Sequence, residues 1–288
     1  MLKLFLKLSL TGLALYLVFG KIEVEETWKL ISSANGFYLL LAVSFFVFSK
    51  IFSALRLNLF FTDLGLRIPS IQNLKLYAIG MFYNLFLPGG IGGDGYKVYL
   101  LNRKYGTPVK NLLSAVFLDR INGLAMLVFL MFLLFLQVEI KEFGEINTGH
   151  WAWVGLLAVT LAFYMGMRFF FQKFMGSLPF TLLYSLCVQF MQLLCSYFIL
   201  EGLGVSDQIM EYLFVFLLSS VVAVLPLTIG GVGARELVFI FSHSYMGIDK
   251  NTAVAFSLLF FVITAATSLT GIFFRFKKGE ISEPGINS

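Results

Sequence analysis

Long apolar runs separated by short polar segments dominate this chain. Six of them are long enough to cross a membrane, because a hydrocarbon core of about 30 Å needs about 20 helical residues at about 1.5 Å each. These runs cover residues 4–20, 37–57, 112–138, 151–171, 178–200 and 252–274. The pattern predicts an all-α integral membrane protein with six full transmembrane helices.

Two further apolar segments, residues 74–105 and 212–245, are interrupted in the middle. In each, a stretch rich in Pro and Gly separates two parts that are too short to span a membrane alone. Proline and clustered glycines do not continue a helix, so we interpret both stretches as breaks. Broken backbone at membrane depth is tolerated only where protein or water surrounds it. We therefore expect two re-entrant helical hairpins.

The two breaks have related sequences. Residues 87–97 are LPGGIGGDGYK and residues 225–235 are LPLTIGGVGAR, at a constant offset of 138 (226 − 88). Leu, Pro, Ile and three Gly coincide, and a basic residue closes both copies. The second copy has Leu227 and Thr228 where the first has Gly89 and Gly90, so the hairpins are not expected to be equivalent. Paired breaks in corresponding halves are typical of a transporter's binding site.

Charge predicts the orientation. If both hairpins return to the side from which they came, thirteen basic residues fall on one side and four on the other. The thirteen are Lys3, Lys7, Arg56, Arg67, Lys75, Arg103, Lys104, Lys110, Arg168, Lys173, Arg275, Lys277 and Lys278. The positive-inside rule makes that side, with both termini, cytoplasmic.

Three full spans separate the two hairpins, so the second is expected to enter from the opposite face. This arrangement is an inverted repeat with halves at about 1–145 and 151–275, within a single transmembrane domain of residues 1–288. The remaining segment, 276–288, is polar and is expected to be a loose C-terminal tail.

Composition supports a membrane protein and excludes several classes. Hydrophobic residues make up 59% and charged residues 13%, with a mean hydropathy of +0.88, whereas soluble domains are about 25% charged. The net charge of +5 therefore does not indicate nucleic-acid binding. Cys187 and Cys195 belong to no metal or redox motif, and we expect no cofactor and no metal. Lys3 and Lys7 stand at the N-terminal end of the first run, and no cleavage pattern follows the run, so we expect an uncleaved span.

Ionisable side chains occur beside both breaks and within the third full span. A charge at the membrane centre costs about 2.5–3.5 kcal/mol, so these groups must pair, face water or do both. Glycines allow a ligand to approach the backbone closely, and helix N-termini attract anions. The candidate substrate-binding residues are Gly89, Gly90, Gly92, Gly93, Asp94, Lys97, Asp119, Arg120, Gly230, Gly231, Gly233, Arg235 and Glu236.

We assign these charges to the binding of a lipid phosphate. Lys97, Arg120 and Arg235 are the candidate anion ligands. The carboxylates are counter-charges or carriers of a coupling proton; they are Asp94, Asp119 and Glu236. Asp119 and Arg120 point about 100° apart on a helix, so we expect their partners to come from elsewhere, with the hairpins as the obvious source.

Structural interpretations of the same residues stay open. Asp94 is favoured by the dipole of its half-helix. Lys97 can extend toward cytoplasmic headgroups. Asp119 and Arg120 can form an interfacial pair if the start of their helix protrudes into the cytoplasm.

Other polar and aromatic residues also allow two interpretations. Arg235 and Glu236 can lock the second hairpin as a pair. Gln189 and Gln192 share one helical face and line a cavity or bond between helices. We interpret the 34 phenylalanines as ordinary lipid-facing bulk.

The motif residues resemble those of a known family, the lysylphosphatidylglycerol synthase transmembrane-region family, also called the flippase-like domain. The residues that carry the resemblance are Asn84, Leu87, Pro88, Gly89, Gly90, Gly92, Gly93, Asp94, Asp119, Arg120, Gly230, Gly231, Gly233, Arg235 and Glu236. The resemblance implies movement of a modified phospholipid or a polyprenyl-linked lipid between leaflets. The full-length synthases carry an additional aminoacyltransferase domain. Because this chain stops soon after Lys278, we expect a stand-alone member that does not aminoacylate lipid.

The sequence thus predicts a flippase-like transporter of anionic lipid, and not an enzyme. It would work by alternating access in the cytoplasmic (inner) membrane of a prokaryote, with protons or another ion as the coupling partner. No nucleotide-binding loop is present to couple ATP. The alternatives are an intramembrane enzyme that modifies lipid phosphates and an accessory subunit of an envelope-biosynthesis enzyme such as a glycosyltransferase.

Overall fold

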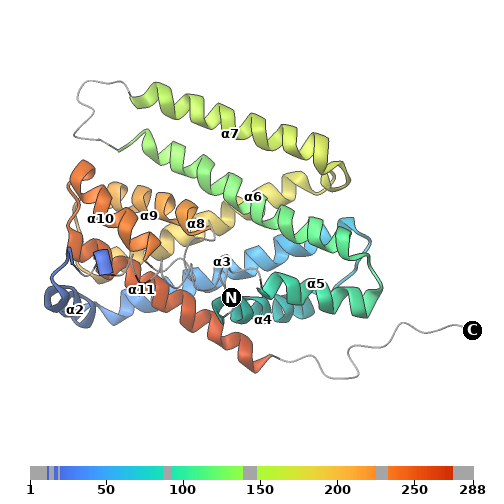
Figure 1. Ribbon diagram of the computed structural model, residues 1–288, viewed down its shortest axis with the longest axis horizontal. Helices are drawn as coiled ribbons and strands as arrows, with labels where there is room; N and C mark the ends of the chain where they lie inside the picture. Colours follow the sequence, from blue (N-terminus) through green and yellow to red (C-terminus); the bar gives the residue numbers. More distant parts are fainter. Residues whose placement is uncertain are drawn as a thin grey trace, which may run out of the picture.

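The computed structural model describes residues 12, 16–18, 20–86, 92–138, 148–224 and 233–274, and every regular element within these ranges is helical (Figure 1). The α-helices are Val24–Ser33 (α2), Gly36–Asp63 (α3), Ser70–Phe86 (α4), Gly92–Tyr105 (α5), Val109–Phe135 (α6), Thr148–Phe170 (α7), Leu178–Gly202 (α8), Ile209–Val224 (α9), Ala234–Met246 (α10) and Lys250–Leu269 (α11). Short 3-10 helices follow α7 and α11, at Gln172–Phe174 (η2) and Thr270–Phe273 (η3).

Five helices in the described part of the chain are long and apolar enough to cross a membrane: α3, α6, α7, α8 and the helix formed by α11 with η3. They coincide with five of the six runs that hydropathy selects. The sixth run, 4–20, lies almost entirely outside the described residues. The prediction of an all-helical multi-pass membrane protein is therefore confirmed.

The polar segment before α3 forms a helix that the apolar pattern did not predict. This helix, α2, carries Glu25 and Glu26 in its first turn and packs against α11. The Asn251 amide of α11 holds it there, accepting from the Glu23 backbone N–H at 3.0 Å and donating to Glu26 at 2.5 Å. The segment is short, so its helix depends on this tertiary contact as well as on its apolar residues Val24, Trp28 and Ile31, which recur at helical spacing.

The helices on either side of each Pro/Gly break are short and pack against each other in pairs. The first pair is α4 and α5, and the second is α9 and α10. Figure 1 shows the pairs in opposite halves of the bundle, with α4 and α5 toward the right and α9 and α10 toward the left. Adding 138 to the bounds of α4 (70 and 86) gives 208 and 224, against 209 and 224 for α9. The related sequences thus form helices of matching length at matching positions.

Helices α3 and α8 make the most extensive interhelical contact, and α7 lies at the edge of the bundle against α6 (Figure 1). The core contains more aromatic residues than the sequence suggested. Phe46, Phe60, Phe61, Phe216, Phe239 and Phe256 are all fully buried. Only some phenylalanines, such as Phe170 and Phe273, are widely exposed in the way expected of lipid-facing bulk. Edge-to-face packing of the buried rings explains their place in the core.

Candidate functional site: a cationic cavity

Side chains from eight helices, α3 to α6 and α8 to α11, line a cavity of about 340 Å³ in the middle of the bundle. Its charged lining residues are Lys50, Arg56, Asp94, Lys97, Asp119, Arg120 and Arg235. Five cations and two carboxylates thus face one space. The cavity is polar, apolar helices surround it, and positive charge is in excess in its lining. We expect such an arrangement where an anion is bound.

The N-terminal turn of α5 forms the first charged group. Asp94, which is only 6% exposed, accepts from Lys97 Nζ at 3.0 Å on one carboxylate oxygen and from Arg120 Nε at 2.5 Å on the other. Lys97 is buried and its ammonium lies 4.5 Å from the centre of the Tyr77 ring. Extension of Lys97 toward the cytoplasmic headgroups is therefore wrong for this structure. The partner of Arg120 lies on α5, the helix that follows the first Pro/Gly break.

Close backbone contact fixes the position of α5 against α4. Gly93 lies so near Gly80 that an added Cβ would be 1.9 Å from the Gly80 carbonyl oxygen, which no side chain can occupy. The Gly93 backbone N–H donates to Asn84 Oδ1 at 2.8 Å, which satisfies one of the unpaired donors at the start of the helix. These contacts hold Asp94 at the cavity.

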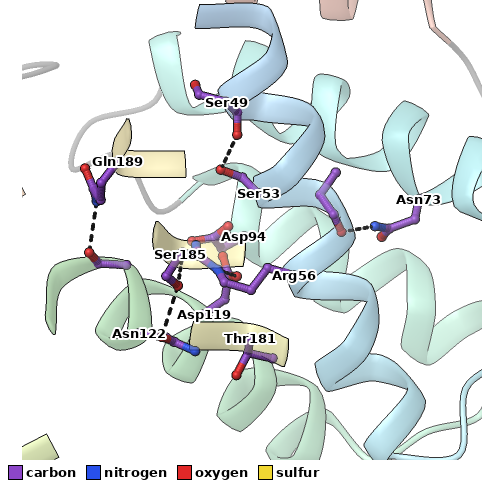
Figure 2. A network of polar contacts seen from close by, with 12 residues as sticks. Ser49, Ser53, Arg56, Asn73, Asp94, Asp119, Asn122, Thr181, Ser185 and Gln189 are labelled. Atoms are coloured by element: carbon purple, nitrogen blue, oxygen red, sulfur yellow. Dashed lines mark hydrogen bonds and ion pairs between the residues drawn. The ribbon is translucent and has the colours of Figure 1, made fainter. Parts of the chain in front are cut away.

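A second ion pair joins α3 to α6. Arg56 Nε donates to Asp119 at 2.7 Å, and Arg56 Nη1 donates to Ser185 Oγ at 2.9 Å. Ser185 in turn donates to Asn122 Oδ1 at 3.0 Å. Figure 2 shows Arg56 directed from α3 toward Asp119 and Ser185. Arg56 is only 5% exposed, so it is an interior residue, although the charge count placed it with the basic residues of the cytoplasmic side. The partner of Asp119 therefore comes from α3 and not from the helices beside the Pro/Gly breaks.

Two further cations rest on aromatic rings. Lys50 Nζ lies 4.3 Å from the centre of the Phe46 ring, and Arg235 Cζ lies 4.8 Å from the centre of the Phe260 ring. The two rings pack edge to face, 5.7 Å apart. Among the described residues neither cation has a carboxylate within 4.0 Å, and the sequences of 87–91 and 225–232 contain no Asp or Glu. Ring faces attract cations but do not neutralise them.

Glu236 points away from the cavity toward the start of its own helix. Its carboxylate accepts from the Gly233 backbone N–H at 2.6 Å and from Ser257 Oγ at 2.8 Å. Gly233 has φ +84°, in the left-handed region that favours glycine. The interpretation of Glu236 as a lock of the second hairpin thus has a geometric basis, although its contacts are to the backbone and Ser257 and not to Arg235.

Uncharged polar groups complete the lining. Gln189 Nε2 donates to the Gly123 carbonyl at 3.0 Å, so this side chain both bonds between helices and lines the cavity, where Gln192 joins it. Gln189 Oε1, Ser220 Oγ and Thr264 Oγ1 are buried and make no hydrogen bond within the described structure. Such atoms are uncommon in proteins, and here they add unpaired hydrogen-bonding groups to the wall of the cavity.

The structure brings together most of the charged residues selected from sequence. Asp94, Lys97, Asp119, Arg120 and Arg235 all line the cavity, whereas Glu236 does not. Gly92 and Gly93 begin α5, and Gly233 immediately precedes α10. The other four candidate glycines, Gly89, Gly90, Gly230 and Gly231, lie outside the described residues.

Sequence reasoning missed Lys50 and the interior role of Arg56. Both lie inside the apolar helix α3, Lys50 near its midpoint. An ionisable residue within a spanning helix is by itself a functional signal, so they could have been found. Within the described ranges, no three His, Cys, Asp or Glu side chains are grouped so that they could hold a metal ion.

A family model and two curated relatives match this chain over most of its length. The family model described as the lysylphosphatidylglycerol synthase TM region matches residues 4–175 and 171–271. A UPF0104 membrane protein of Methanocaldococcus jannaschii is 26% identical over 210 residues, covering 64% of this chain and 88% of the relative. A UPF0104 membrane protein of Pyrococcus horikoshii is 23% identical over 292 residues, covering 82% of this chain and 85% of the relative. Neither name states a substrate.

Proposed function

Since the chain belongs to the lysylphosphatidylglycerol synthase transmembrane-region family, we propose that it moves lipids with an anionic headgroup between the leaflets of a membrane. The observation that carries this proposal is the cavity, in which five cations face two carboxylates inside a bundle of apolar helices. Bringing a charged headgroup to the membrane interior is strongly unfavourable without compensating charge. The cavity supplies that compensation.

The proposal includes a topology of six full spans and two re-entrant hairpins, arranged as an inverted repeat. Helices α4, α5, α9 and α10 have 17, 14, 16 and 13 residues, fewer than the ~20 that a crossing helix needs. The matching positions of α4 and α9, and the opposite placement of the two pairs in Figure 1, support two hairpins that enter from opposite faces.

Charged residues near the helix ends support cytoplasmic termini. At the ends of α5 and α7 and the start of α6 the charges are basic: Arg103, Lys104, Lys110, Arg168 and Lys173. Around α2 and the starts of α9 and α11 they are mainly acidic: Glu23, Glu25, Glu26, Asp207, Glu211 and Asp249. By the positive-inside rule the first group faces the cytoplasm of a prokaryotic cell.

Headgroup binding would act on the hairpins through the ion pairs. Asp94 joins α5 to α6 by accepting from Arg120, so an anionic headgroup that passes Arg120 and Lys97 in the cavity competes with that contact. Loosening of α5 from α6 on one side, with the corresponding change at α10 on the other, would give alternating access. The lipid tails stay in the bilayer. Protons or another ion could bias the exchange by neutralising Asp94 or Asp119.

Transport by the purified protein in liposomes tests the proposal. A short-chain fluorescent phosphatidylglycerol and the matching phosphatidic acid are placed in both leaflets, and a membrane-impermeant reductant then bleaches the outer label. Proteoliposomes should bleach beyond the outer-leaflet fraction, whereas protein-free liposomes should stop there. Mass spectrometry of the recovered lipid should show unchanged masses. Bleaching that stops at the outer leaflet for both lipids would contradict transport, and converted lipid would indicate an enzyme instead.

A further inference from the structure

Positive side chains outnumber carboxylates around the cavity. Five cations line it: Lys50, Arg56, Lys97, Arg120 and Arg235. Three carboxylates lie in or directly behind the lining: Asp94, Asp119 and Glu236. The difference of two positive charges lies among apolar helices, where an uncompensated charge is costly.

Two of the five cations have no carboxylate within 4.0 Å among the described residues. Asp94 forms ion pairs with Lys97 and Arg120, and Asp119 forms one with Arg56. The Glu236 carboxylate accepts hydrogen bonds from Gly233 and Ser257. Lys50 and Arg235 remain, each seated on one of two rings that touch. The contact between Phe46 and Phe260 brings a cation from α3 and a cation from α10 to the same part of the cavity.

Polar side chains that can donate hydrogen bonds lie in the same lining. Ser220 and Thr264 carry hydroxyls that have no partner within the described structure, and Gln192 offers an amide. A terminal phosphate has three strong acceptor oxygens and a charge near −2. A phosphodiester has fewer free oxygens and a single charge.

On the basis of the transport function proposed above, we propose that Lys50 and Arg235 form the subsite for a dianionic terminal phosphate. The preferred lipid headgroup is then a phosphomonoester, in preference to a phosphodiester or a cationic aminoacylated headgroup. A dianion neutralises both excess charges, a phosphodiester leaves one, and an aminoacylated headgroup with a net positive charge increases the excess.

Competition binding to the purified full chain tests this inference. The probe is fluorescent phosphatidic acid at pH 7.5, where the second phosphate proton, with a pKa of about 6, is largely lost. Competitors are phosphatidylglycerol with the same chains and inorganic phosphate. We expect phosphatidic acid to bind at least about tenfold more tightly than phosphatidylglycerol, which corresponds to a difference of about 1.4 kcal/mol. Inorganic phosphate should compete far more weakly, because it lacks the tails.

Substitutions of Lys50 and Arg235 test whether these two cations cause the preference for phosphatidic acid. Lys50→Gln and Arg235→Gln should each reduce the preference for phosphatidic acid to less than about twofold, since one excess charge then remains. Lys50→Arg and Arg235→Lys keep the charge and should retain the preference. Lys110→Gln, at an exposed position outside the cavity, is the matched control. The thermal midpoint of each variant shows whether it is folded.

Each contrary result has a distinct meaning. Equal binding of the two lipids, or a preference that survives in both glutamine variants, would overturn the subsite while transport of phosphatidylglycerol in liposomes could still stand. Competition by inorganic phosphate as strong as that by phosphatidic acid would make a free anion the occupant and overturn the lipid assignment. Selective binding of phosphatidic acid without movement in liposomes would retain the subsite and reject the transport proposal.

Discussion

Lys97 and Arg235 close the two copies of the repeated motif and line the same cavity, yet among the described residues Lys97 has a carboxylate within 4.0 Å and Arg235 has none. The partner, Asp94, lies three residues before Lys97, and the corresponding position before Arg235 is Val232. The two halves of the repeat have therefore diverged in charge. The first copy holds its cation in an ion pair, whereas the cation of the second copy lies against the Phe260 ring.

Asp94→Asn should strongly destabilise the protein. The change removes the only carboxylate within 4.0 Å of Lys97 in the described structure and weakens the contact with Arg120. Breaking a buried ion pair from one side costs about 3–5 kcal/mol, because the remaining charge is left uncompensated. The thermal midpoint in detergent should fall clearly, whereas Asp207→Asn, at an exposed loop, should leave it unchanged. An unaltered midpoint in Asp94→Asn would contradict the geometry described for α5.

Lys50→Gln should have the opposite effect on stability. Lys50 has no carboxylate within 4.0 Å among the described residues, so its replacement removes a charge that the fold does not compensate. Since such a charge costs about 2.5–3.5 kcal/mol at the membrane centre even on lenient scales, the thermal midpoint of the ligand-free protein should rise. A fall comparable to that of Asp94→Asn would indicate that Lys50 has a structural partner, and would count against its role as a ligand.

Gly93→Ala and Gly95→Ala form a matched pair in the same turn of α5. A Cβ at Gly93 would collide with the Gly80 carbonyl, while a Cβ at Gly95 meets nothing within 4 Å. Overpacking of this kind typically costs about 1–3 kcal/mol, and alanine in an open helical position gains about 1 kcal/mol over glycine. Thermal unfolding should therefore show destabilisation for Gly93→Ala only. Equal midpoints for the two variants would mean that α4 and α5 do not approach as closely as described.

Single-cysteine labelling tests the orientation. In a background with Cys187→Ala and Cys195→Ala, cysteines replace the exposed residues Arg103 and Lys173 at one end of the bundle and Lys29 and Asp207 at the other. A membrane-impermeant maleimide added to intact cells lacking an outer membrane barrier should label positions 29 and 207, and should label 103 and 173 only after lysis. Labelling of positions from both groups in intact cells would contradict the hairpin topology.

The long helices were predictable from sequence for a simple physical reason. A membrane core requires uninterrupted apolar runs, and α3, α6, α7, α8 and α11 each satisfy that requirement without help from tertiary contacts. The ends of α4 and α9 were equally clear, because Pro and clustered Gly stop a helix locally. Helix α2 was not predictable in this way, since its ten residues are too few to cross a membrane and it is held by contacts with α11.

Pairing within the site depended on tertiary structure and was predicted only in part. Arg120 pairs with Asp94 on the helix that follows the first break, but the partner of Asp119 is Arg56, which the charge count placed with the basic residues of the cytoplasmic side. The contact of Glu236 with the start of its own helix was predictable from local sequence. It stands three residues after Gly233, the spacing at which a glutamate caps the start of its own helix.

The central claim is that an anionic headgroup crosses at Lys50 and Arg235, and the most direct measurement is the initial rate of transbilayer movement of fluorescent phosphatidic acid in proteoliposomes. The account predicts that the double variant Lys50→Gln/Arg235→Gln, reconstituted as folded protein, falls to the rate of protein-free liposomes, while Lys110→Gln moves lipid at the wild-type rate. A double variant that still moves phosphatidic acid at the wild-type rate would contradict the account.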